Sequence, residues 1–303
     1  MDVAQRNIVG RAFLGIVAYL IEDFLDDDDD DENLWEHVTV DINEFCVMGD
    51  PSFQWHFRLT KPVFEILLQE IGNHLVDNML MERERRPVAH ILLMVLVLRD
   101  MKDTYITWPN AEERNTIKRN CQRISNFPGI VGIMDGSHIF IKAPKEERAA
   151  YRNYKYGYSI KVQAVVDDSL LVRDAYIGEV VSLHDARVFR RSPLCRSILQ
   201  RQDLFSNGEH IIADAAYMLL DRVLVPFVNN GHLTVRQRNY NRKLSQVRVR
   251  VEHTFGRIDS LWRRMTYLPN TNIDYAVDHI AASIVLHNFN IIHKQAWNIV
   301  SNS

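Results

Sequence analysis

Cysteine is scarce in this 303-residue sequence, and the three that occur are far apart. They are Cys46, Cys121 and Cys195, and no two of them form a CxxC pair. An odd number without metal-finger spacing argues against a zinc site and against a disulfide framework. This usage is typical of reduced thiols in an intracellular compartment, so we assign the cysteines no functional role.

Long uncharged hydrophobic runs are also missing. The most apolar N-terminal stretch, Ile8–Leu25, is interrupted by Arg11, Glu22 and Asp23. A bilayer crossing needs about 20 nearly uncharged residues, and a secretory signal needs a basic start and a small-residue cleavage site. The sequence has neither pattern, so we expect no membrane span and no signal peptide.

The formal net charge of −3 hides an uneven distribution of charge. Residues 1–60 contain 14 acidic and 3 basic side chains, including the acidic run Asp26–Glu32, whereas the rest of the chain contains 33 basic and 25 acidic ones. We interpret the acidic run as a solvated, mobile segment, with a cover over a basic groove as the alternative. The basic remainder suits a chain that approaches phosphates, although this mild excess is also common in proteins that never bind DNA.

The distribution of charged and apolar residues divides the chain into three parts. Residues 1–32 form an acidic N-terminal segment, residues 33–128 a helical region, and residues 129–297 an α/β domain. In the helical region, apolar residues recur at helical spacing from Phe57 to Ile71, with Thr60-Lys61-Pro62 as the helix start. A second helix is expected at Val88–Leu98, and a third ends near Ser125.

From Gly129 onward the pattern changes to short apolar strands. Strands are expected at residues 130–134, 158–166, 170–177 and 209–214, and helices at 186–202, 242–265 and 273–297. The Asp135-Gly136 pair is expected to end the first strand. This order of elements predicts one mixed sheet with helices packed on it, which is an α/β fold.

Three carboxylates in this domain suit phosphodiester chemistry. Asp135 and Asp214 follow predicted buried strands, where open α/β sheets tend to place ligands. Glu252 lies in a predicted helix near Leu244 and Val249 on one face, so we expect its carboxylate to point inward from an apolar stripe. A few carboxylates on rigid elements suit Mg²⁺, and two ions about 3.5–4 Å apart can activate and neutralise the reacting oxygens.

Each carboxylate also has an ordinary structural interpretation. Asp135 can belong to an Asp-Gly turn, Asp214 can cap a helix, and Glu252 can pair with Arg248 on the surface. For any one of them taken alone, the structural interpretation is the commoner outcome. The functional one depends on the whole set and on the sequence words around it.

Four sequence words surround these residues in order. They are Ile133–Ile139 (IMDGSHI), Ser182–Phe189 (SLHDARVF), Ile211–Tyr217 (IIADAAY) and Val251–Arg257 (VEHTFGR). Together they resemble the PIF/Harbinger transposases and the nucleases domesticated from them. The resemblance extends over about residues 57–293 and includes Leu286-His287-Asn288-Phe289 near the end.

This resemblance implies a ribonuclease-H-like fold with a DDE triad. The triad corresponds to Asp135, Asp214 and Glu252, which would be catalytic and would bind a divalent metal, Mg²⁺ or Mn²⁺. Asp185 is a further metal candidate, with capping of the helix from Ala186 as its structural alternative. The resemblance also implies DNA as substrate, a Myb-like DNA-binding protein partner, no small-molecule cofactor, and a location in the nucleus with the cytoplasm as a second site.

One segment departs from the family pattern. Family members carry a helix-turn-helix-like segment between the helix that resembles Val88–Leu98 and the word Tyr105–Pro109. In this chain only Arg99–Thr104 bridges the two. The helix-turn-helix part is therefore truncated, which indicates a domesticated or decayed transposase or an error in gene prediction.

Two basic stretches are candidate DNA contacts. Residues 142–161 combine six Lys or Arg with four tyrosines, and residues 236–264 contain nine Lys or Arg around Glu252. Lys and Arg contact phosphates, and tyrosines can stack on bases. The candidates are Lys142, Lys145, Arg152, Lys155, Lys161, Arg248, Arg250 and Arg257.

The sequence therefore favours a metal-dependent DNA endonuclease or transposase-type enzyme. The alternative is a catalytically inactive adaptor on the same fold that binds DNA or a protein. The intact carboxylates favour the enzyme, and the truncated recognition part favours the adaptor. A phosphohydrolase for small substrates is a weaker third interpretation, because a small phosphate ester does not need so extended a basic surface.

Overall fold

The computed structural model describes residues 49–51, 59–77, 98–144, 146–153, 157–200, 203–262, 265–269 and 271–301. The chain forms two compact units. The first contains Met1–Tyr105, Ser260–Arg264 and Asp278–Ser303, and the second contains Ile106–Asp259 and Met265–Val277. The acidic segment 1–32 and, apart from Leu98, the helix expected at 88–98 lie outside the described residues, so the predicted boundaries and the truncation stay predictions.

Helices make up the described part of the first unit. They are α4 (Lys61–Asp77), α6 (Lys102–Tyr105) and most of α11 (Ile273–Ser301). Helix α4 begins at the predicted Thr60-Lys61-Pro62 start. Tyr105 joins these helices, because its hydroxyl donates to Glu70 and its carbonyl accepts from Asn288 Nδ2 at 2.8 Å. Among the described residues, we find no helix with the length and apolar character that a membrane crossing requires.

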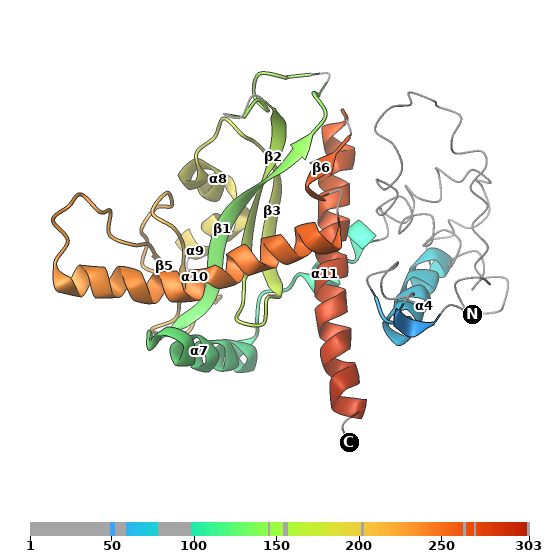
Figure 1. Cartoon of the computed structure of the whole chain (residues 1–303), viewed down its shortest axis with the longest axis horizontal. Coiled ribbons are helices and arrows are strands. Elements are labelled where there is room, and N and C mark those ends of the chain that lie inside the picture. Colours follow the sequence, from blue (N-terminus) through green and yellow to red (C-terminus); the bar gives the residue numbers. More distant parts are fainter. Residues whose placement is uncertain are drawn as a thin grey trace. The chain divides into compact units, whose positions relative to one another are not determined.

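The second unit is built on a six-stranded mixed sheet, shown in Figure 1. Its strands are β1 (Ile130–Ile141), β2 (Tyr158–Val166), β3 (Val172–Val180), β4 (His210–Ile212), β5 (Val223–Leu224) and β6 (Tyr267–Leu268). The order is β3-β2-β1-β4-β5, and β6 also pairs with β1. The first three strands are antiparallel, whereas β4, β5 and β6 add parallel pairs. This arrangement confirms the expected mixed sheet with flanking helices.

Among the residues that the structure describes in this unit, four helices flank the sheet. They are α7 (Ala111–Ser125), α8 (Asp185–Arg191), α9 (Pro193–Leu199) and α10 (Val235–Leu261). The single helix expected at 186–202 was wrong, because Pro193 holds Ser192 in an extended conformation (φ −64°, ψ 148°) that ends α8. Ser192 then caps α9 by accepting from the Cys195 amide at 3.2 Å.

Strand β1 continues past the residues that were expected to end it. Asp135 pairs with Ala164 and Gly136 with Gln163 in the antiparallel ladder, which runs on to Ile141. The predicted strand end was therefore wrong. An Asp-Gly pair favours a turn only where no neighbouring strand takes up its backbone hydrogen bonds, and here β2 does so on one side of β1.

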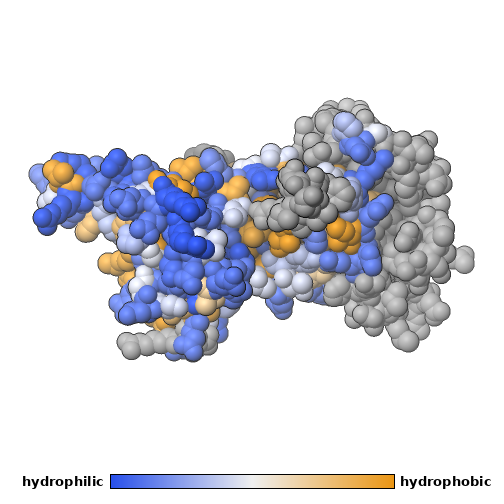
Figure 2. Space-filling model, turned by 90° about the horizontal axis from the view of Figure 1, so that it is seen from below, coloured by the Kyte–Doolittle hydropathy of each residue, from blue (hydrophilic) through white to orange (hydrophobic). Residues whose placement is uncertain are grey.

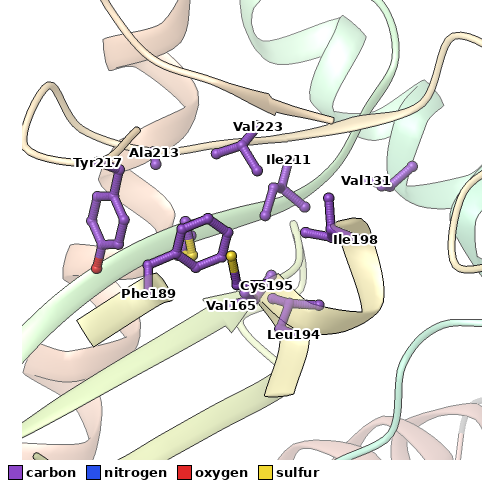
Figure 3. Packing of buried hydrophobic residues seen from close by; sticks show 11 residues of the cluster. Val131, Val165, Phe189, Leu194, Cys195, Ile198, Ile211, Ala213, Tyr217 and Val223 are labelled. Carbon is purple, nitrogen blue, oxygen red and sulfur yellow. The ribbon is translucent and has the colours of Figure 1, made fainter. Parts of the chain in front are cut away.

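An apolar cluster joins the sheet to α8 and α9, as Figure 3 shows. Its members are Val131, Met134, Val165, Phe189, Leu194, Cys195, Ile198, Ile211, Ala213, Tyr217 and Val223. Complete burial of a large apolar side chain contributes roughly 1.5–3 kcal/mol. Because β1, β4 and the segment after β4 all contribute to this cluster, it fixes the backbone that leads to Asp135 and the backbone on either side of Asp214.

Candidate carboxylate site

Asp135 and Asp214 are brought side by side by the register of two parallel strands. Ile133 of β1 pairs with Ile212 of β4, and each aspartate follows its paired isoleucine by two residues. The negative charge of Asp214 is one of the causes that raise the pKa of Asp135. The structure therefore places together two of the three carboxylates that the sequence analysis selected.

Asp135 is largely enclosed and is held by two donors. Its Oδ1 accepts from the Gly136 amide at 2.8 Å, and its Oδ2 accepts from Arg248 Nη2 of α10 at 3.0 Å. Burial is the main cause of its raised pKa, and the two donors oppose that shift. The carboxylate thus stays ionised most readily when a cation lies beside it, and in this structure Arg248 is that cation.

Asp185 reaches the same part of β1 from the helical layer of α8. Gly136 permits this approach, because a Cβ built there would lie 3.1 Å from Asp185 Oδ1 and 3.4 Å from the Tyr217 hydroxyl. Helix α8 starts at Asp185 itself, and its preceding residue His184 makes no side-chain cap. The alternative in which Asp185 caps a helix from Ala186 is therefore wrong, and the carboxylate is directed to the site.

Lys161 is the counterion of Asp185. Its ammonium lies 2.7 Å from Asp185 Oδ1 and donates to the Leu183 carbonyl at 2.8 Å. The residue is only 5% exposed. This burial does not fit the DNA contact that the sequence analysis expected of Lys161, because a phosphate cannot reach an ammonium that is enclosed and already paired.

Tyr217 places a hydroxyl among the three aspartates. It is 5% exposed, its ring packs edge-on against Phe189 at 6.0 Å, and Figure 3 shows it at one end of the apolar cluster. The hydroxyl has no hydrogen-bond partner among the described residues. Burial raises the pKa of Tyr217, and the charges of the three aspartates raise it further. The sequence analysis quoted Tyr217 in a motif but gave it no role.

Glu252 lies on the exposed side of α10. The buried stripe of this helix consists of Leu244, Val247, Val251, Thr254 and Ile258. The expectation that Glu252 points inward from an apolar stripe was therefore wrong. Glu252 lies one turn after Arg248, and it makes no hydrogen bond or ion pair within the described part of the chain.

The donor set fits a divalent cation, although it is not arranged as a closed site. In the ranges that the structure describes, no three His, Cys, Asp or Glu side chains lie close enough to enclose one ion. Asp135 and Asp214 nevertheless offer the hard carboxylate oxygens that Mg²⁺ and Mn²⁺ prefer. Arg248 supplies a positive charge at the position where these two carboxylates need one.

The remaining DNA-contact candidates have different surroundings. Lys142 and Arg152 are exposed, Arg250 and Arg257 are half-buried, and Arg248 is paired with Asp135. Lys145 and Lys155 lie outside the described residues. For these side chains, DNA contact stays a prediction.

Comparisons with known proteins point to one family. The profile of the family described as DDE superfamily endonuclease matches residues 134–288, just over half of the chain. A protein named ALP1-like from Arabidopsis thaliana is 23% identical over 185 residues, which cover 55% of this chain and 44% of that protein. The putative nuclease HARBI1 of Homo sapiens is 25% identical over 209 residues, covering 64% and 56%. The mouse protein of that name is 26% identical over 190 residues, covering 60% and 52%.

The chain spans about half the length of these curated relatives, and no solved structure matches it significantly. The relatives confirm the resemblance to Harbinger-derived proteins, and the mixed sheet with its flanking helices is the ribonuclease-H-like fold of DDE endonucleases. Since the family profile covers just over half of the chain, including β1 from Met134 onward, β4, the three aspartates and Glu252, the chain belongs to the DDE superfamily endonucleases.

Proposed function

We propose that this chain is a transposase-derived, divalent-metal-dependent DNA endonuclease. The observation that carries the proposal is the parallel register of β1 and β4, which sets Asp135 beside Asp214 inside a DDE endonuclease domain. Two adjacent carboxylates on a rigid sheet repel each other and gain most from a shared cation. Such a pair is what phosphodiester cleavage with hard cations requires.

Asp135 and Asp214 would hold the metal, with Asp185 as a further oxygen donor and Glu252 as the third member of the triad. When bound, Mg²⁺ or Mn²⁺ would lower the pKa of a water molecule so that it loses a proton and can attack, and would neutralise the charge on the leaving oxygen. The chain itself keeps the two aspartates in register through the apolar cluster. Lys161 holds Asp185 in place through an ion pair of 2.7 Å.

Arg248 and Glu252 belong to the same segment of α10 and have complementary roles. They are four residues apart, so they lie on adjacent turns of one side of the helix. Arg248 neutralises Asp135. Asp135 and Asp214 would hold a divalent ion whose charge takes the place of that of Arg248, which would leave the guanidinium available for a DNA phosphate. Glu252 would supply the third carboxylate from the next turn of α10.

Cleavage of labelled duplex DNA by the purified chain tests this proposal. With Mg²⁺ or Mn²⁺ we expect cutting that EDTA abolishes. Asp135→Asn, Asp214→Asn and Glu252→Gln should each lower the rate by about a hundredfold or more, because each removes a charge that acts on the reacting oxygens. The control is Asp203→Asn, which removes one carboxylate from an exposed position outside the site.

The adaptor alternative has its own supporting observation. Arg248 already neutralises Asp135, and Glu252 is exposed and directed away from the buried stripe of its helix. A chain fixed in this arrangement would bind DNA or a protein without cutting. DNA binding that is unaffected by Asp214→Asn, together with no cleavage in either metal, would establish the adaptor in place of the nuclease.

A Myb-like protein partner and a nuclear location are also part of this proposal. Both follow from the resemblance to Harbinger transposases alone. Co-purification of a Myb-like protein with the tagged chain, and imaging of that chain in cells, test them separately from catalysis.

A further inference from the structure

One segment of the second unit carries positive charge without any negative charge. Between Asp221 and Glu252 the chain has seven Lys or Arg residues and no Asp or Glu. Arg248 is paired with Asp135, but none of the other six forms an ion pair within the described ranges. Positive charge that the protein does not neutralise itself favours a polyanionic partner.

The first part of this segment is a rigid arm, which we define as residues 225–243. Asn241 on α10 binds both backbone groups of Phe227, accepting from its amide at 2.9 Å and donating to its carbonyl at 2.8 Å. Tyr240 packs against Phe227 at 5.2 Å and against Phe127 at 5.5 Å. The loop is thus fixed on the helix, so binding would cost little ordering entropy.

The arm projects away from the sheet within the second unit. Figure 1 shows the loop and the first turns of α10 extending beyond the edge of the strands. The same end of the molecule is mainly hydrophilic in Figure 2, with small hydrophobic patches. Val228 and Val235 are exposed by 71% and 73%. This projection makes the basic side chains of the arm accessible to a large ligand.

An exposed row on α10 connects the arm to the candidate site. With 3.6 residues per turn, Arg238, Arg242, Ser245, Val249 and Glu252 fall on one side of the helix. All five are exposed, which agrees with that placement. At 1.5 Å per residue, Arg238 lies about 21 Å along the axis from Glu252.

We propose that this row and the arm form a track for the phosphate backbone of double-stranded DNA beside the cleavage position. The inference rests on the proposed function, because it names the surface that presents DNA to the carboxylates. About 21 Å corresponds to roughly six base pairs at 3.4 Å per pair along one strand. Arg238 and Arg242 contact phosphates of the flanking duplex, independent of its sequence.

Binding of a fluorescently labelled duplex of about 30 base pairs, measured in EDTA across a NaCl series, tests this track without requiring catalysis. The test variant is Arg238→Gln/Arg242→Gln. Each lost phosphate contact lowers the slope of log affinity against log salt by about 0.9, so we expect a loss of about 2 and roughly tenfold weaker binding. The matched control is Arg190→Gln/Arg196→Gln, which removes two exposed arginines from α8 and α9 and should leave the slope unchanged.

The conservative variant Arg238→Lys/Arg242→Lys keeps both charges and should keep the slope. If Arg238→Gln/Arg242→Gln binds DNA with the wild-type slope, the inference is overturned. The proposed nuclease function survives that result if the wild-type protein cuts DNA. Conversely, DNA binding that depends on the arm, with no cleavage in Mg²⁺ or Mn²⁺, supports the track and excludes the proposed nuclease function. If the wild-type protein is a dimer in solution and Val228→Ser/Val235→Ser makes it a monomer with unchanged DNA binding, the arm serves self-association and the inference is overturned.

Discussion

The two ion pairs beside strand β1 differ in how exposed the cation is and in how completely its donors are satisfied. In the Lys161–Asp185 pair the side chains are 7% and 27% exposed, and the ammonium also donates to the Leu183 carbonyl. In the Arg248–Asp135 pair they are 20% and 19% exposed, and Arg248 Nε is buried without an acceptor among the described residues.

This difference separates a structural pair from an exchangeable one. A buried ammonium with two acceptors cannot leave without exposing unsatisfied groups, so Lys161 fixes the start of α8 and with it Asp185. The guanidinium of Arg248 uses only some of its N–H donors in hydrogen bonds, and the residue lies on a helix with exposed neighbours. We infer that a divalent ion can replace Arg248 beside Asp135 but cannot replace Lys161 beside Asp185.

The largest effect is expected from Lys161→Met. It leaves the partly buried Asp185 carboxylate without its counterion, so we expect the free energy of unfolding to fall by about 2–3 kcal/mol. Thermal and urea unfolding measure this loss. A double-mutant cycle with Asp185→Asn should return a coupling energy above about 1 kcal/mol. A coupling near zero would show that this pair is as replaceable as the other one.

The second-largest loss of stability is expected at Gly136, whose missing side chain lets Asp185 approach β1. Gly136→Ala would place a methyl group 3.1 Å from Asp185 Oδ1, so we expect a destabilisation of about 1–2 kcal/mol. Gly256→Ala is the control, because nothing lies within 4 Å of its added Cβ and the residue sits in α10. That change should stabilise the protein by roughly 0.5–1 kcal/mol. Equal effects at both glycines would contradict the close approach of Asp185.

The sequence could predict the strands and two of the carboxylates, because apolar runs followed by aspartate are a local signal. It could not predict that Asp135 lies in the middle of a strand. Asp-Gly is a turn signal in isolation, and only pairing with β2 keeps Gly136 extended. Lys161 was misjudged for the same reason. A count of basic residues treats it as a surface charge, whereas in β2 it alternates with apolar residues and pairs with Asp185.

Helix α10 shows a second kind of limit. Its buried stripe is defined by five residues whose spacing fits a helix. The sequence analysis instead placed Glu252 on one face with Leu244 and Val249. Val249 is 37% exposed, so the inferred face was rotated from the true one. A long helix with few apolar residues permits several faces, and only packing against the sheet selects one of them.

The third effect is expected from Arg248→Met, whose cost should be about 1 kcal/mol in EDTA because both side chains of the pair are partly solvated. The variant no longer supplies a competing cation beside Asp135, so we expect Mn²⁺ to bind several-fold more tightly than in wild type. Calorimetric titration with MnCl₂ measures the affinity, and the shift of the unfolding temperature with MnCl₂ gives an independent value. Weaker Mn²⁺ binding in the variant would mean that Arg248 supports the metal site and does not compete for it.

The smallest effect on stability is expected from Tyr217→Phe. The hydroxyl is buried and has no partner among the described residues, so its removal should change the free energy of unfolding by less than about 0.5 kcal/mol. Tyr176→Phe is the matched control, because the Tyr176 hydroxyl donates to Glu179 at 2.7 Å and its loss should cost about 0.5–1.5 kcal/mol. If Tyr217→Phe instead lowers the free energy of unfolding more than Tyr176→Phe does, the Tyr217 hydroxyl is hydrogen-bonded in the folded protein. The three aspartates around it are then the candidate acceptors. If the acceptor is Asp185, Tyr217 and Lys161 both hold that carboxylate, which would make the Lys161–Asp185 pair still less exchangeable than the Arg248–Asp135 pair.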